Sequence, residues 1–131
     1  MKKDIKIPEV KDVYIALVKE KVDNSNTSEW SVYIINTKEE NLDLVIIVSE
    51  GFSKTKKTST LRKTIKHLPQ KSYAKVEILQ ESLIKFTNLF KVSFFKDNQI
   101  FDKTFTFQPN TIIDENLVDI PLIKNKGILA E

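Results

Sequence analysis

The stretch of this sequence with the clearest chemical character is a run of basic residues in its middle. Residues 51–76 contain eight lysines and arginines and no acidic residue, although the net charge of the whole chain is only +3. Basic side chains that are set apart from acidic ones neutralise phosphate groups, so the run predicts a surface that attracts a polyanion. The hydroxyl groups in TKKTSTLRKT (55–64) would add hydrogen bonds to such a partner.

Four cations of the segment 54–66 are candidates for a polyanion-binding patch: Lys56, Lys57, Arg62 and Lys66. Arg62 and Lys66 share one face of a regular strand, and the two lysines sit in the preceding loop, where their side chains can turn to the same side. Phe52 and Tyr73 are candidates for stacking on bases. The interpretation that we favour for the run is a solvated edge strand, because lysines there prevent sheets from pairing edge to edge.

Residues that could catalyse a reaction or bind a metal are sparse. The chain has no cysteine, and His67 is its single histidine, with no nucleophile motif around it. Gly51 and Gly127 are the only glycines, which excludes a glycine-rich nucleotide-binding loop. The acidic pairs Glu39–Glu40 and Asp114–Glu115 point to opposite faces in a strand and are solvated in a loop. The sequence therefore predicts no enzyme, no cofactor and no bound metal.

Short runs of alternating apolar and polar residues must position these side chains. They occupy residues 12–18, 30–35, 41–49, 72–79, 89–95 and 100–107. A period of two is the pattern of a strand that buries one face, and these runs are rich in β-branched and aromatic residues. The alternation predicts a core that contains Leu44, Ile46, Val76, Ile78, Val92, Phe94, Phe105 and Phe107.

Three further segments are less regular. Residues 58–68 have apolar residues at helical spacing but many β-branched ones, and we favour a strand because the neighbouring elements are strands. Residues 79–90 also show helical spacing, which indicates a short helical turn. Residues 116–131 are too apolar to be free, so we expect them to lie along the sheet as an extended segment.

Turn-forming residues separate the strands, and Lys96-Asp97-Asn98-Gln99 leaves room for a tight hairpin. Short strands at this spacing predict an all-β fold, namely a single-domain antiparallel β-sandwich of about seven strands that is immunoglobulin-like. The domain spans residues 1–131, with the extended C-terminal segment at 116–131. A small closed barrel is the alternative.

Two resemblances add to this interpretation. The segments VYIIN (32–36), LDLVIIV (42–48) and LPQKSYAKVEIL (68–79) resemble immunoglobulin-like or fibronectin-III-like sandwiches, which implies an architecture and no particular function. The segments IPEVKDVY (7–14), 57–79 and KGILAE (126–131) resemble a family of short bacterial proteins, some of them labelled phenylalanyl-tRNA synthetase α subunits. That resemblance implies a family without synthetase activity, because a class II catalytic core is far larger than this chain.

The function that we expect is that of a non-enzymatic binding module whose partner is another protein or a second copy of itself. Exposed strand edges and the apolar tail favour this hypothesis. The alternative is an accessory nucleic-acid binder that uses residues 54–66 to contact RNA or tRNA. The N-terminal MKKDIKIPEV lacks the apolar core of a signal peptide, and no run of about 20 apolar residues could span a membrane. We therefore expect cytoplasmic residence.

Overall fold

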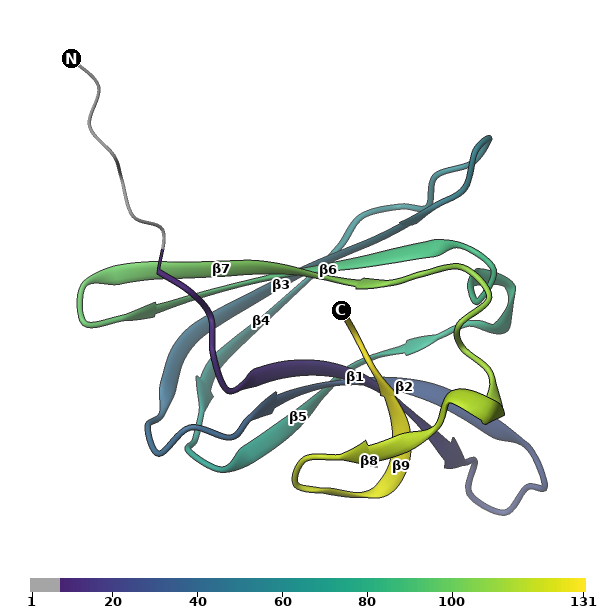
Figure 1. Cartoon of the computed structure of the whole chain (residues 1–131), viewed down its shortest axis with the longest axis horizontal. Coiled ribbons are helices and arrows are strands. Elements are labelled where there is room, and N and C mark those ends of the chain that lie inside the picture. Colours follow the sequence, from purple (N-terminus) through teal and green to yellow (C-terminus); the bar gives the residue numbers. More distant parts are fainter. Residues whose placement is uncertain (1–7) are drawn as a thin grey trace.

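Two antiparallel sheets stacked on each other make up the structure, a computed structural model that describes residues 8–131 (Figure 1). The start of MKKDIKIPEV, on which the prediction of cytoplasmic residence partly rests, lies outside the described residues. The strands are β1 (Val13–Lys21), β2 (Ser28–Asn36), β3 (Leu42–Phe52), β4 (Leu61–Leu68), β5 (Ser72–Leu79), β6 (Thr87–Lys96), β7 (Gln99–Phe107), β8 (Val118–Ile120) and β9 (Ile123–Leu129). Two 3₁₀ turns, η1 (Glu81–Leu83) and η2 (Asp114–Asn116), complete the elements.

The predicted all-β sandwich is confirmed. One sheet has the order β5-β2-β1-β9-β8 and the other the order β4-β3-β6-β7. Strands β1 to β7 correspond to the expected set of about seven. The C-terminal segment raises the number to nine, because it folds back as the hairpin β8–β9 instead of running as a single extended piece. No helix in residues 8–131 is long and apolar enough to cross a membrane.

The core lies between the two sheets and is built from aliphatic and phenylalanine side chains. Of the predicted core residues, five are buried: Val76, Val92, Phe94, Phe105 and Phe107. Two edge-to-face or stacked ring pairs strengthen this layer, Phe90 with Phe107 and Phe94 with Phe101. Strands β6 and β7 supply all four of these rings, and their pairing runs from Asn88 opposite Phe107 to Lys96 opposite Gln99 without a break.

The prediction for strand β3 was wrong at two positions, Leu44 and Ile46. Leu44 is 43% exposed and Ile46 is only half-buried, whereas Val45 and Ile47 are buried. The cause is a β-bulge: Leu44 has a φ of 51°, and the register with β6 shifts between Asp43 and Ile46. A bulge inserts one residue into the alternation, so every later residue of β3 changes face.

Ile78 was also predicted to be in the core, and it is 47% exposed. Strand β5 has a register shift of its own, because Val32 pairs with Glu77 and Tyr33 with Lys75, which leaves Val76 as the extra residue. Beyond Val76 the faces are exchanged. Leu79 is therefore buried, and Glu77 turns toward the other sheet.

Three further local predictions, for one strand, one helical turn and one hairpin loop, are confirmed. Residues 61–68 form a strand, in agreement with the choice made for 58–68, and residues 81–83 form a short helical turn. The hairpin between β6 and β7 has the two-residue loop Asp97-Asn98, and both residues have positive φ. Two positive φ angles in succession are the signature of a type I′ turn, whose twist matches the flanking strands.

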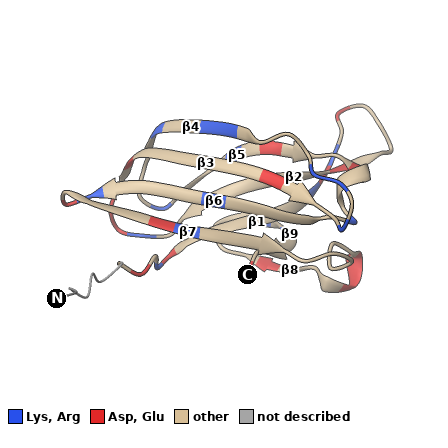
Figure 2. Cartoon of the chain, turned by 90° about the horizontal axis from the view of Figure 1, so that it is seen from above, with Lys and Arg blue, Asp and Glu red and all other residues tan. Residues whose placement is uncertain are grey.

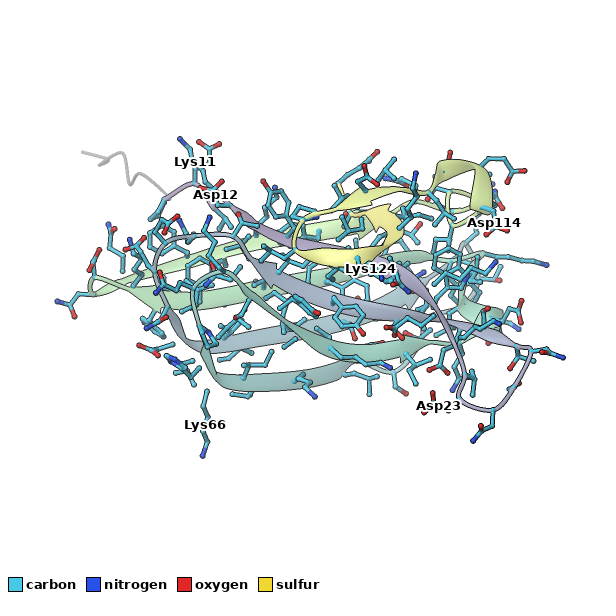
Figure 3. The ribbon with its side chains drawn as sticks, turned by 90° about the horizontal axis from the view of Figure 1, so that it is seen from below. Lys11, Asp12, Asp23, Lys66, Asp114 and Lys124 are labelled. Carbon is cyan, nitrogen blue, oxygen red and sulfur yellow. The ribbon has the colours of Figure 1, made fainter. Side chains whose placement is uncertain are left out.

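The C-terminal hairpin β8–β9 extends the five-stranded sheet from β1 and folds over part of the outer face of β1 and β2 (Figure 3). Ile120 is buried against Ala16, Val18 and Ile35, which form a second, smaller apolar cluster on that face. The packing is tight at Gly127, where an added Cβ would lie 2.2 Å from the backbone oxygen of Leu17. A larger residue at this position would therefore push β9 away from β1.

The two long sides of the sandwich differ. On one side the chain end links the sheets, since Glu131 and Thr106 exchange two backbone hydrogen bonds of 2.9 Å (Figure 1). We call this the joined side. On the other side β4 and β5 each end a sheet and do not pair with each other. We call this the open side.

Candidate functional site

The structure places the predicted cations along the open side, partly on a loop and partly on a strand. Lys56 and Lys57 lie on the β3–β4 connection, which projects beyond the body of the sandwich (Figure 1). Arg62 and Lys66 lie on β4, four positions apart, which corresponds to about 13 Å along a strand. The four residues therefore follow one edge and do not gather into a compact cluster (Figure 2).

Some of these cations have acidic neighbours and others do not. Lys57 Nζ lies 3.6 Å from Glu50 Oε1, so its charge is partly neutralised. Five cations of the segment form no ion pair within residues 8–131, and we call them the cationic edge: Lys54, Lys56, Arg62, Lys63 and Lys66. All five are exposed, and Lys66 projects away from the edge of the sandwich (Figure 3). The cationic edge is a line of unneutralised positive charge.

The two aromatic candidates lie apart from each other, and only Phe52 lies near the cationic edge, at its loop end, where its backbone bridges to Lys57. Tyr73 is on β5, in the other sheet, and packs edge to face against Tyr33 with ring centroids 5.7 Å apart. Phe52 ends β3 and is 37% exposed. Neither side chain lies beside the β4 cations Arg62 and Lys66, so the structure does not bring the predicted stacking platform together.

The titratable residues that the sequence singled out lie in ordinary surface ion pairs. His67 Nδ1 is 2.9 Å from Asp43 Oδ1, and both side chains are exposed. Lys96 lies 2.6 Å from Glu40, and this hydrogen bond raises the pKa of Lys96. Asp114 pairs with Lys19 at 2.9 Å. Among residues 8–131 no group of three or more histidine or acidic side chains is arranged to hold a metal ion.

Sequence reasoning missed a groove of about 260 Å³ on the open side. It lies where β4 and β5 diverge, between the start of the β3–β4 connection and η1. Its walls are apolar and include Leu61, Leu79, Leu83 and Phe90. Its polar residues come from three strands that are remote in sequence and from the connections beside them. On the strands they are Ser49, Glu50 and Gly51 of β3, Glu77 of β5 and Asn88 of β6, and on the connections Thr58, Ser59 and Gln80. We call this site the groove.

Hydrogen bonds hold the polar groups of the groove in place. Ser49 Oγ donates to Glu77 Oε1 across the two sheets at 2.8 Å. The hydroxyl of Thr58 accepts a 2.8 Å bond from the backbone N–H of Gly51, which fixes the start of the projecting connection. Asn88 is buried, and its Nδ2 donates to the backbone oxygens of Leu83 and Phe86 at 2.9 and 3.1 Å. The groove is thus preorganised by contacts within the chain.

One signal in the sequence could have revealed the groove. Once the bulge at Leu44 is known, Ser49 and Gly51 fall on the inward face of β3, in phase with Val45 and Ile47. A serine and a glycine are unusual at two successive inward positions. A buried hydroxyl needs a hydrogen-bond partner, and a glycine has no side chain to fill the closely packed core. The bulge hides this signal, since without it the same residues count as outward.

A second polar network lies on the outer face of the five-stranded sheet, beside β5. Tyr33 Oη donates to Glu20 Oε2 at 2.7 Å, and Lys75 Nζ lies 3.7 Å from Glu20 and 3.8 Å from Glu29. Burial and the hydrogen bond to Glu20 raise the pKa of Tyr33 to about 12. Burial by itself would raise the pKa of Glu20, but nearby hydroxyl groups and the Lys75 ammonium together lower it. Glu20 and Glu29 each have a partner in this network, whereas the buried Ser31 Oγ has no hydrogen-bond partner within residues 8–131.

Comparisons of the chain with protein-family models, with curated proteins and with solved structures found no match. The function of the open side is therefore inferred from its geometry and charge.

Proposed function

We propose that this chain is a non-enzymatic binding module that receives an extended segment of another protein, or of a second copy of itself, on its open side. The observation that supports the proposal is that β4 and β5 are both unpaired along one edge and flank a groove of about 260 Å³. An extended segment binds such an edge through main-chain hydrogen bonds and places alternate side chains in neighbouring pockets. Cytoplasmic residence is part of this proposal.

Exposed apolar side chains on the open side favour the same function. Leu61 is 55% exposed at the start of β4, and Ile78 is 47% exposed near the end of β5. Both residues line the groove, so a docked segment would bury apolar surface in addition to forming main-chain bonds. β4 has eight residues, which gives a template of about 26 Å for strand addition.

A labelled preparation of the full chain tests the proposal by nuclear magnetic resonance. The probes are peptides of the length of β4 that alternate valine with lysine or with threonine. We expect backbone amide shifts in β4, β5 and the groove and none in β7. Leu61→Ser should weaken binding, and Ile100→Ser is the matched control, because Ile100 is 52% exposed on the same sheet but faces away from the open side. Shifts confined to β7, or no shift with any peptide, would contradict the proposal.

A second copy of the chain is one form of the partner, and sedimentation at increasing concentration tests it. Size that grows with concentration in the wild type, and that Leu61→Ser abolishes, would identify the partner as the chain itself. Association that survives Leu61→Ser but is lost in Ile100→Ser would place the interface on the other face of the sheet and contradict the open-side assignment.

The cationic edge favours a second candidate function, binding of single-stranded RNA. Cations that form no ion pair can bind phosphates, and this binding releases counterions. The logarithm of the association constant for RNA therefore falls by about 0.7 per phosphate contact for each tenfold rise in salt concentration. Fluorescence anisotropy with a mixed-sequence RNA at low and moderate salt measures this slope. The test variant replaces Lys56, Lys57, Arg62 and Lys66 with glutamate. Absence of binding by the wild type at low salt would remove this candidate, and binding by the variant would move it elsewhere.

A further inference from the structure

Glu77 differs from the other half-buried carboxylates of the chain. Four acidic residues within 8–131 are half-buried: Glu20, Glu29, Glu50 and Glu77. The first three each have a lysine within ion-pair distance. Glu77 has none in the described part of the chain, and its one hydrogen-bond donor is the hydroxyl of Ser49. A carboxylate has about four acceptor positions, so most of its capacity is unused.

The free hydrogen-bond acceptor positions of the Glu77 carboxylate are accessible from the groove. The bulge at Val76 turns the side chain of Glu77 toward the interior, where it lines the groove. The walls around it are apolar, with Leu61 and Leu79 on the two edge strands and Phe90 between them. A half-desolvated carboxylate beside apolar walls costs free energy unless a cation pairs with it.

The size and composition of the groove restrict the cation. Its volume of about 260 Å³ is below the usual range of sites for drug-sized ligands, roughly 300–1,000 Å³, and suits a single side chain. Within residues 8–131 no group of three or more histidine, aspartate or glutamate side chains is arranged to hold a metal ion, so the groove does not offer the usual ligand set for one. Lysine and arginine carry one positive charge on an aliphatic stem, and such a stem packs along apolar walls while its head reaches a carboxylate.

We propose that the groove is a socket for the side chain of a lysine or arginine in the partner protein, with Glu77 as the residue that binds its charged head. This inference rests on the proposed function and adds to it the chemistry of the anchoring residue. Ser49 orients the Glu77 carboxylate through their 2.8 Å hydrogen bond, and Gly51 leaves the space beside Asn88 open, because a Cβ there would lie 2.9 Å from Asn88 Oδ1. The socket thus recognises a positive charge through Glu77 and an aliphatic stem through its apolar walls.

Two small probes test the socket without an extended segment. They are Nα-acetyl-lysine amide and Nα-acetyl-norleucine amide. Their side chains share a straight four-carbon stem, and only the lysine compound carries an ammonium group at its end. In the ¹⁵N-labelled full chain we expect the lysine compound to shift the backbone amides of Ser49, Gly51 and Glu77, and the norleucine compound to leave them unchanged. Equal shifts with both compounds would overturn the proposal.

The variant Glu77→Gln keeps an acceptor for Ser49 Oγ but removes the charge, and we expect it to bind the lysine compound at least about tenfold more weakly. Glu81→Gln is the matched control, because it removes the same charge from an exposed residue four positions further on, outside the groove. Thermal melts of both variants verify that they fold. Unchanged binding by Glu77→Gln, or equal losses in the two variants, would overturn the role of Glu77.

The outcomes distinguish the socket from the proposed function. If valine–threonine peptides bind the open side and lysine adds nothing, the binding function stands and the socket fails. If the lysine compound binds in the groove and no extended peptide binds β4 or β5, the socket stands and the strand-addition function fails. If spermidine binds the groove more tightly than the lysine peptide, the assignment to a protein side chain is overturned.

Discussion

The joined and open sides solve the same physical problem in different ways. Each sheet of a sandwich leaves strand edges whose N–H and C=O groups need partners or protection. On the joined side, Glu131 pairs with Thr106 and so carries backbone hydrogen bonding from one sheet to the other. On the open side, β4 presents Arg62, Lys63 and Lys66, whose charges discourage indiscriminate pairing with the sheet edges of other proteins but leave the edge itself unpaired. At Thr106 the joined side is closed by backbone hydrogen bonds, whereas the open side carries charged side chains along β4.

This difference has a consequence for function. Where Glu131 pairs with Thr106, the joined side cannot accept a further strand without breaking those two hydrogen bonds. On the open side the cations are exposed side chains and β4 and β5 have no further strand partner within residues 8–131, so this side stays accessible to an extended segment. The groove and the carboxylate of Glu77 both lie on the accessible side. Differences in stability and in accessibility between the two sides are therefore measurable.

The largest expected contrast compares two inward-facing residues of the edge strands of one sheet. Phe105 on β7 is 2% exposed, and Leu61 on β4 is 55% exposed. We expect Phe105→Ala to lower the free energy of unfolding by about 3–5 kcal/mol and Leu61→Ala to change it by no more than about 0.5 kcal/mol. Urea unfolding curves measure both values. A large cost for Leu61→Ala would show that something covers the open side in solution.

The two glycines of the chain give a second contrast. A Cβ at Gly127 would meet the backbone oxygen of Leu17 at 2.2 Å, whereas one at Gly51 would meet a side-chain oxygen of Asn88 at 2.9 Å. We expect Gly127→Ala to cost about 1–3 kcal/mol, because neither strand can move without breaking the β1–β9 pairing. Gly51→Ala should cost less than about 1 kcal/mol, since Asn88 can shift. Equal costs in urea unfolding would mean that the groove is as rigid as the joined side.

The smallest expected effect is a pH dependence beside β5. The pKa of Tyr33 is raised to about 12 in the folded chain, so the folded state holds the phenol proton more tightly than the unfolded state. The stabilisation by this group is complete below its ordinary pKa of about 10 and is lost as the pH rises toward 12. Tyr33→Phe should therefore make the stability decline less steeply between pH 10 and pH 12. Melting temperatures of the wild type and the variant, recorded across this pH range, measure the difference. Parallel declines would contradict the role of the Tyr33–Glu20 bond.

Strands β6 and β7 show what local pattern predicts well. Most of their apolar residues occupy a single parity, with Val92 and Phe94 alternating with the polar Lys91 and Ser93. The exceptions are Leu89, Phe95 and Ile100, which lie on the opposite parity. The two-residue loop between them fixes the register, and no bulge interrupts it. Alternation, turn and register agree with one another, so the predicted core residues in this hairpin are all buried.

Strand β3 shows why the same method fails elsewhere. Its sequence LDLVIIV (42–48) is apolar on both parities, so hydrophobicity by itself does not state which face is buried. The choice between Leu44 and Val45 depends on a bulge that pairing with β6 imposes. The same ambiguity occurs in strand β5, where the adjacent residues Ile78 and Leu79 are both apolar and the register shift at Val76 decides which of them is buried. In both strands a single inserted residue exchanges the faces.

The sequence by itself determined that this chain is an all-β sandwich without cysteine chemistry and that its positive charge is concentrated in residues 51–76, because periodicity and composition are local properties. Tertiary structure decided which strand edges are joined and which are open, since that depends on where Glu131 meets Thr106. It also decided that Ser49, Glu77 and Asn88 line one groove. These residues lie on three strands, and only the packing of the two sheets, with a bulge in β3 and in β5, brings them together.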